Sequence, residues 1–119
     1  MRNVDATLLN LVSVTSPTAV QTAPMIVDQI IAYAFHGIVT GTVTGTFILQ
    51  ASCDSGRTPR GDGVTNWVDI AGATATLALA TPVMINVQNP GYKWVRAVYT
   101  PSAGTGTISV RMTGKGDAA

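Results

Sequence analysis

The chain has 119 residues, a length that corresponds to one domain because chains usually divide at roughly 100–200 residues per domain. It is 46% hydrophobic and only 11% charged, with a formal net charge of +1. This composition excludes intrinsic disorder, which requires low hydrophobicity and high net charge, and it provides no cationic surface for general nucleic-acid binding. All acidic residues are Asp and none is Glu, while Thr and Val are abundant, which favours an all-β protein.

The sequence predicts neither a membrane span nor an internal disulfide. Residues 29–53 contain no Asp, Glu, Lys or Arg, but their longest purely apolar run, 30–35, is far shorter than the roughly 20 residues that a spanning helix needs. The single cysteine, Cys53, has no partner in the chain. The N-terminus lacks a secretory pattern, because Asp5 precedes its short apolar stretch. We therefore expect a protein that is soluble by itself or through assembly, without a membrane partner.

The first half of the chain contains three segments with the alternation of strands. Residues 7–15 predict a first strand, within an N-terminal strand or arm that covers 1–24. Residues 25–40 form a long apolar segment, whose start also fits a turn of helix but whose β-branched and aromatic end predicts a strand. Residues 42–53 predict a third strand, with Phe47, Leu49 and Ala51 on one face.

The second half begins with a polar loop and continues as short strands. The loop, 54–66, is rich in Gly and charge, and the strands after it are separated by turn residues that include an Ala-Gly pair after the first of them. The predicted strands are 67–70, 74–79, 82–88, 92–100 and 107–112. About seven to nine short strands at this spacing are typical of an antiparallel β-sandwich or jelly roll. We expect 25–116 to form this single domain and 117–119 to be a frayed tail.

The apolar positions of these strands predict the core. Alternation and size select eleven residues for it: Leu9, Leu11, Phe35, Phe47, Leu49, Trp67, Ile70, Trp94, Val98, Ile108 and Val110. The aromatic residues also allow another interpretation, because exposed rings on a β-sandwich can stack on sugars. The four candidates for such a platform are Trp67, Tyr92, Trp94 and Tyr99.

The sequence contains no recognisable catalytic or metal-binding pattern. His36, the only histidine, lies in the most apolar segment and is expected to be a core or interface residue. Cys53 ends an alternating strand and is expected to be a buried small apolar residue. Three aspartates, Asp54, Asp62 and Asp69, do not have the spacing of a calcium loop. We expect no enzymatic activity, no catalytic residues and no metal or other cofactor.

The 54–66 loop is the best candidate for a contact with another protein. Arg60-Gly61-Asp62 matches a cell-adhesion tripeptide, but a charged pair around glycine is ordinary turn chemistry. Since loops carry much of protein recognition, Arg57, Arg60 and Asp62 are the predicted residues of a contact with a neighbouring subunit.

Three segments taken together resemble small virion structural proteins of tailed bacteriophages. In that group a strand ending in L-Q-A-S-x-D leads to N-W-x-x-I, and a later G-Y-x-W/Y-V-R-x-x-Y-T strand precedes a Gly/Thr turn and a last strand ending near G-K-G. The matching segments here are GTVTGTFILQASCD (41–54), NWVDIAG (66–72) and NPGYKWVRAVYTPSAGTGTISVRMTGKG (89–116). The loop between Asp54 and Asn66 is longer than the group's pattern, so its contacts are expected to be particular to this chain.

The resemblance implies a β-sandwich subunit of the virion. Its most direct form is a head decoration or cement protein that binds the major capsid protein and copies of itself, as a dimer or trimer, and stabilises the capsid lattice. The low charge supports assembly, since a monomer with so little charge is prone to associate and large exposed apolar patches usually mark interfaces. The alternative is a tail or fibre module that recognises a glycan or protein of the host surface.

Overall fold

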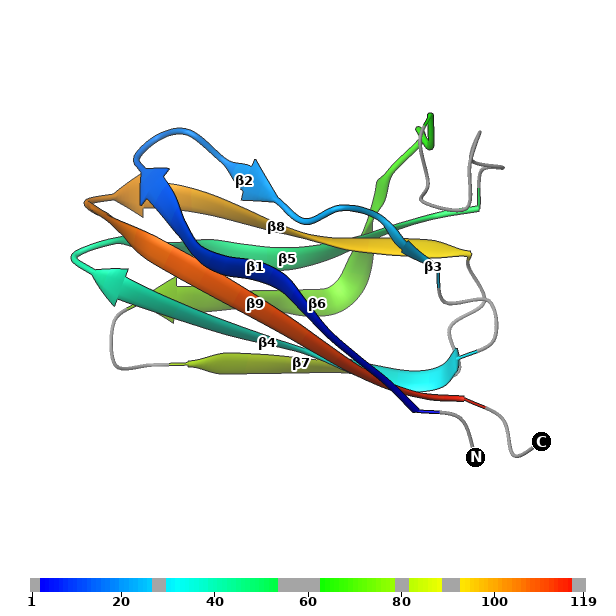
Figure 1. Cartoon of the computed structure of the whole chain (residues 1–119). Coiled ribbons are helices and arrows are strands. Elements are labelled where there is room, and N and C mark those ends of the chain that lie inside the picture. Colours follow the sequence, from blue (N-terminus) through cyan, green and yellow to red (C-terminus); the bar gives the residue numbers. More distant parts are fainter. Residues whose placement is uncertain (1–2, 27–29, 54–62, 79–81, 89–92, 117–119) are drawn as a thin grey trace.

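The computed structural model describes residues 3–26, 30–53, 63–78, 82–88 and 93–116. In these residues the backbone forms nine strands in two antiparallel sheets that pack face to face (Figure 1). Sheet I has the order β1-β9-β4-β7, with the bounds Asn3–Thr15, Thr105–Gly116, Ile30–Gly41 and Val83–Gln88. Sheet II has the order β2-β8-β5-β6, with the bounds Val20–Gln21, Trp94–Ala103, Thr44–Ser52 and Val68–Ala78, and β3 (Met25–Ile26) also pairs with β8.

The connectivity is that of a jelly roll. β2 and β3 lie one after the other on the same edge of β8, because β5 occupies its other edge, so they are two pieces of one broken strand. The chain changes sheet at every connection except this break and the β5–β6 hairpin, and the first strand pairs with the last. Two four-stranded sheets connected in this way form a jelly roll. The predicted fold class, an antiparallel β-sandwich, is confirmed.

The core lies between the two sheets and follows the predicted alternation in the central strands. On β5, Phe47 and Leu49 are fully buried, and on β9 the buried residues Ile108 and Val110 flank outward-facing positions. Six of the predicted core residues are buried: Phe35, Phe47, Leu49, Trp94, Ile108 and Val110. Leu9 and Ile70 are partly buried against the core. Alternation therefore identifies the core where a strand has neighbours on both sides and an unbroken pleat.

Leu11 was wrongly predicted to be in the core, and a pair of bulges explains why. Its side chain is 62% exposed. β1 shifts register against β9 between Thr7 and Leu9 and again between Leu9 and Val12, and Leu11 itself has a φ of 51°. Each extra residue reverses the faces of the strand. The Leu11 amide instead donates a hydrogen bond to Ser109 Oγ, at 3.1 Å.

The predicted turn at Ala71-Gly72 is also wrong, because β6 continues through it as one strand. Ile48 pairs with Thr74 and Gln50 pairs with Asp69, so five steps along β6 oppose two along β5. Gly72 has a φ of +78°, a conformation that glycine adopts without steric cost. Ala71 and Gly72 therefore lie in a wide bulge of β6 and do not form a turn, and β6 bends sharply at this bulge (Figure 1).

The remaining predictions about the core and the chain ends have mixed outcomes. Trp67 and Val98 are half-buried instead of buried. Within the predicted N-terminal strand or arm, residues 3–15 form β1, and within the apolar segment 25–40 residues 30–40 are strand throughout. The predicted frayed tail, 117–119, lies outside the described residues. In the part of the chain that is described, no helix has the length and apolarity to cross a membrane.

Candidate functional site

The predicted contact residues Arg57, Arg60 and Asp62 lie outside the described residues, so the site is built from what surrounds their segment. That segment follows Cys53 and precedes Gly63, and both of these residues are described. Strands β5, β6 and β8 of sheet II meet at this end of the sandwich. The side chains described below lie on these strands and on the residues next to them, 52–53 and 63–67.

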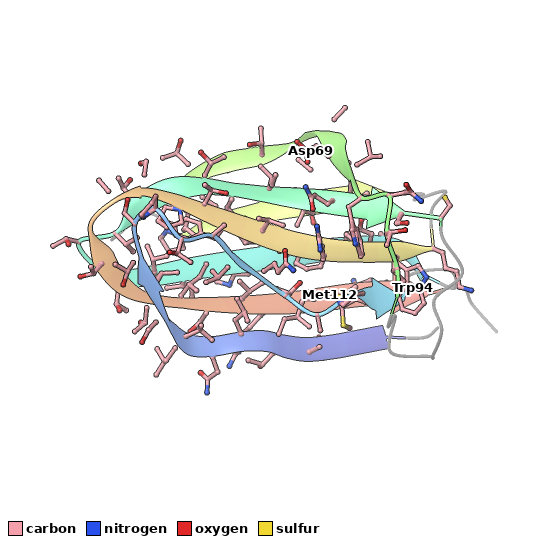
Figure 2. The ribbon with its side chains drawn as sticks, turned by 90° about the horizontal axis from the view of Figure 1, so that it is seen from above. Asp69, Trp94 and Met112 are labelled. Atoms are coloured by element: carbon pink, nitrogen blue, oxygen red, sulfur yellow. The ribbon has the colours of Figure 1, made fainter. Side chains whose placement is uncertain are left out.

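A row of polar side chains crosses the three strands on the outer face of sheet II. Gln50 on β5 lies opposite Asp69 on β6 and opposite Arg96 on β8. Its amide Nε2 donates to Asp69 Oδ1 at 2.9 Å, and its Oε1 accepts a hydrogen bond from Arg96 Nε, also at 2.9 Å. A single amide thus joins a carboxylate and a guanidinium that lie on strands which do not pair with each other. Figure 2 shows Asp69 on this face, above the strands of sheet II.

Trp67 extends this row toward the loop. The guanidinium carbon of Arg96 lies 4.3 Å from the centroid of the Trp67 ring, which places the cation within the range of a cation–π contact. The indole Nε1 donates to the Val64 carbonyl at 3.2 Å. Burial lowers the pKa of the Arg96 guanidinium from its ordinary value. Trp67 is therefore half-buried because its ring is packed against a charged side chain outside the core.

Hydrogen bonds also hold both sides of the loop base. Ser52 Oγ at the end of β5 donates to the Thr65 carbonyl at 2.7 Å, and the Ser52 carbonyl accepts a bond from the Lys93 amide at 3.2 Å. Beside them, Trp94 is 2% exposed, and Figure 2 shows it at this end of the sandwich. The Lys93 ammonium lies 5.8 Å from the Trp94 ring centroid. The residues on either side of 54–62 are thus fixed to sheet II.

An open cleft of about 470 Å³ lies next to the loop base. Its walls include Cys53, Asn66, Val68 and Ile70, and Val68 is 66% exposed. Cys53 was predicted to be buried, which is wrong: it is exposed. It lies just after the end of β5, so the alternation of that strand does not extend to it.

The other residues whose side chains could take part in chemistry do not belong to this site. His36 is half-buried on β4 and pairs in register with Arg111 and Met84. Tyr99 is 1% exposed and its hydroxyl donates to the Leu77 carbonyl at 2.9 Å, while burial raises the pKa of the phenol. Among the described residues, no three His, Cys, Asp or Glu side chains lie close enough together to hold a metal ion. Asp54, Asp62 and Tyr92 lie outside the described residues.

The three sequence segments that carry the bacteriophage resemblance meet in this row. Gln50 belongs to the L-Q-A-S segment, Trp67 and Asp69 belong to N-W-V-D-I, and Arg96 belongs to W-V-R. This association is not predictable from the sequence, because the residues lie on or next to three strands whose register depends on the whole sheet. These contacts join strands β5, β6 and β8 and the residues that precede β6.

Comparisons with known proteins agree with the fold. No protein-family model matches the chain, and no curated protein is significantly similar to it in sequence. Among solved structures, the SPBc2 prophage-derived protein YomS is similar with a TM-score of 0.57 at 10% identity, covering 94% of this chain and 93% of that one. The N-terminal cellulose-binding domain of Cellulomonas fimi β-1,4-glucanase C has a TM-score of 0.50 at 8% identity, covering 90% and 77%. At these identities the likeness establishes a shared β-sandwich fold.

Proposed function

We propose that the chain is a structural subunit of a tailed-bacteriophage virion, and more specifically a head decoration protein that binds the major capsid protein and copies of itself. The observation that carries the proposal is the overlap, along nearly the full length of both chains, with a protein described as prophage-derived. The three segments that carry the resemblance also contribute the residues of one side-chain row. The proposal assigns no catalytic step to the chain.

The geometry of the loop base suits a docking role. A loop whose two ends are fixed loses less conformational entropy on binding than one that is free at its base. Ser52, Trp67 and Arg96 provide that fixation through hydrogen bonds and a ring contact. The charges of Arg57, Arg60 and Asp62 in the loop would then supply orientation and specificity at the capsid surface.

The distribution of charge supports assembly. The described charged residues are Asp5, Asp69, Lys93, Arg96, Arg111 and Lys115. Strands β4, β5 and β7 carry none of them, so much of the sandwich has an uncharged exterior. Four large apolar side chains are nevertheless exposed on the described surface: Leu11, Ile38, Val68 and Met84. Ile38 and Met84 lie near each other on the paired strands β4 and β7, and exposed apolar patches usually mark interfaces.

Co-sedimentation with capsids tests the proposal. Purified wild-type protein should pellet with heads that lack the subunit, and the triple variant Arg57→Ser/Arg60→Ser/Asp62→Ser should bind at least about tenfold more weakly, a loss of about 1.4 kcal/mol. The matched control is Asp5→Ser/Arg111→Ser/Lys115→Ser. It also removes two positive charges and one negative charge, but from β1 and β9, and it should bind as wild type. Wild-type protein that does not pellet with heads would contradict the proposal.

A tail-associated module that recognises a host glycan is the second candidate. Its support is the shared fold with a domain described as cellulose-binding. The site offers it little, because Trp94 is 2% exposed and Arg96 lies over the Trp67 ring. Glycan-array binding that is lost in Trp67→Ala, together with immunogold label on tails and none on heads, would favour this candidate over the first.

A further inference from the structure

The free edges of the two sheets differ in how well they could accept another strand. An open edge exposes backbone donors and acceptors, and proteins usually interrupt such an edge with bulges, prolines or charges. Within the described residues, β1 has two register shifts, and β6 has the wide bulge at Gly72 and carries Asp69. The β2–β3 edge is broken between Gln21 and Met25, where Pro24 has no amide proton to donate.

Thr22 also closes part of the broken edge. Its amide donates to the Ala97 carbonyl at 2.9 Å, and its hydroxyl accepts a hydrogen bond from the Ala97 amide at 3.0 Å. The Thr22 side chain therefore takes the place of a backbone acceptor and is 3% exposed. Three of the four described edges thus have a feature that opposes strand addition.

β7 has none of these features. Its six residues, Val83–Gln88, pair with β4 without a register shift and include no proline, glycine or charged residue. In the part of the chain that the structure describes, no strand lies on its other side. An uninterrupted, neutral edge strand is a template for pairing with another chain.

The surroundings of β7 favour a second copy of this chain as its partner. Met84 is 61% exposed and lies opposite His36 of β4. Ile38, two residues further along β4 on the same face, is 39% exposed. A two-fold axis brings the residues of an edge next to their own copies, so a charged edge would repel itself. Neither β7 nor its neighbour β4 carries an Asp, Glu, Lys or Arg. This side of the sandwich is therefore electrostatically compatible with itself.

We infer that β7 pairs antiparallel with β7 of a second copy, joining two copies of sheet I into one continuous eight-stranded sheet. Strand addition satisfies the open backbone groups of both edges, and the exposed Met84 side chains gain cover from the other copy. The inference deepens the proposed function and rests on its self-association, because it names the surface where two copies meet. It does not depend on attachment to a capsid.

Charge variants of β7 test the inference by sedimentation velocity under reducing conditions, which prevent disulfides through Cys53. Wild-type protein should dimerise. Met84→Lys/Asn86→Lys places like charges opposite each other in any two-fold register centred near the middle of β7, and should shift the monomer–dimer midpoint to at least about tenfold higher concentration. Met84→Glu/Asn86→Glu should do the same, and a mixture of the two variants should restore the dimer.

The matched control places two lysines at the same spacing on the edge strand β6, as Thr74→Lys/Thr76→Lys, where both residues are exposed. It should dimerise as wild type. A monomeric wild type, or an oligomer that the lysine pair on β7 leaves unchanged, would overturn the inference. Should the lysine pair prevent folding, as judged by circular dichroism, the glutamate pair carries the same test. Head binding by a monomeric wild type would refute the β7 pairing and leave capsid attachment intact.

Discussion

Replacing Arg96 by Met should destabilise the protein by about 2 kcal/mol, because the guanidinium holds two partners at once. It donates to Gln50 Oε1 at 2.9 Å and lies 4.3 Å from the centroid of the Trp67 ring. A hydrogen bond from a charged group contributes about 1.5 kcal/mol at the lower end of its range, which fits a half-buried site. A cation–π contact at such a site contributes about 0.5–1 kcal/mol. Methionine keeps the apolar stem, so lost packing adds little.

Urea unfolding measures this loss, and a double-mutant cycle separates its parts. Crossing Arg96→Met with Trp67→Leu should give a coupling energy of about 0.5–1 kcal/mol, the contribution of the ring contact alone. Arg111→Met, on the exposed side of β9, is the control and should change stability by no more than about 0.5 kcal/mol. A loss at Arg96 no larger than that of the control, or a coupling energy of zero, would refute the structural role assigned to this row.

Four further predictions concern single side chains. Tyr99→Phe should lower the free energy of unfolding, measured in urea, by about 1–2 kcal/mol, because the Leu77 carbonyl loses its hydrogen bond. Burial raises the pKa of Tyr99 in the folded state above its ordinary 10.0, so the stability of the wild type should fall as the pH rises above 10. This fall should be smaller in the variant. Leu11→Gly should raise the melting temperature, since the residue is exposed with a φ of 51° and such a backbone costs a non-glycine residue about 1–2 kcal/mol; a lower melting temperature would contradict this. Cys53 should react with a thiol reagent in the native protein at the rate of a small thiol, whereas a slow reaction would restore the buried assignment. Trp94→Ala should cost about 3–5 kcal/mol and abolish soluble folding, and unchanged melting would show that Trp94 does not support the fold.

The sequence predicts the fold class and the central strands because their evidence is local. Alternation in β5 and β9 identifies Phe47, Leu49, Ile108 and Val110 as buried, since a flat strand with two neighbours keeps its two faces separate. The jelly-roll order itself depends on which strands pair. The number and spacing of the strands predict either a simple antiparallel β-sandwich or a jelly roll, and they do not distinguish the two.

The errors come from bulges and strand ends, where pairing with a distant segment changes the pattern. Leu11 turns outward because β1 gains residues against β9, and Ala71-Gly72 continues a strand because β5 accepts the wide bulge. Cys53 is exposed because β5 ends one residue before it. None of these departures is visible in the segment that contains it, since register is a property of two strands.

The candidate site was only partly predictable for the same reason. The sequence predicts a contact at the 54–66 loop because this loop concentrates charge, glycine and proline, and the contact stays a prediction. It gives no sign that Gln50, Trp67, Asp69 and Arg96 would support that loop together. These residues are far apart along the chain, on β5, on and just before β6, and on β8. They form a row only because the three strands pair in this register.

The pairing of the first described strand with the last has a consequence for how the protein is made. β9 lies between β1 and β4 in sheet I, so β1 has no partner strand, and β4 has only β7, until β9 has been synthesised. β5 and β6 are consecutive strands, so they can pair with each other much earlier in synthesis. Long-range pairing of this kind slows folding and leaves strand edges open meanwhile. We expect chains in which β9 has been synthesised and paired to be the form that associates with other subunits.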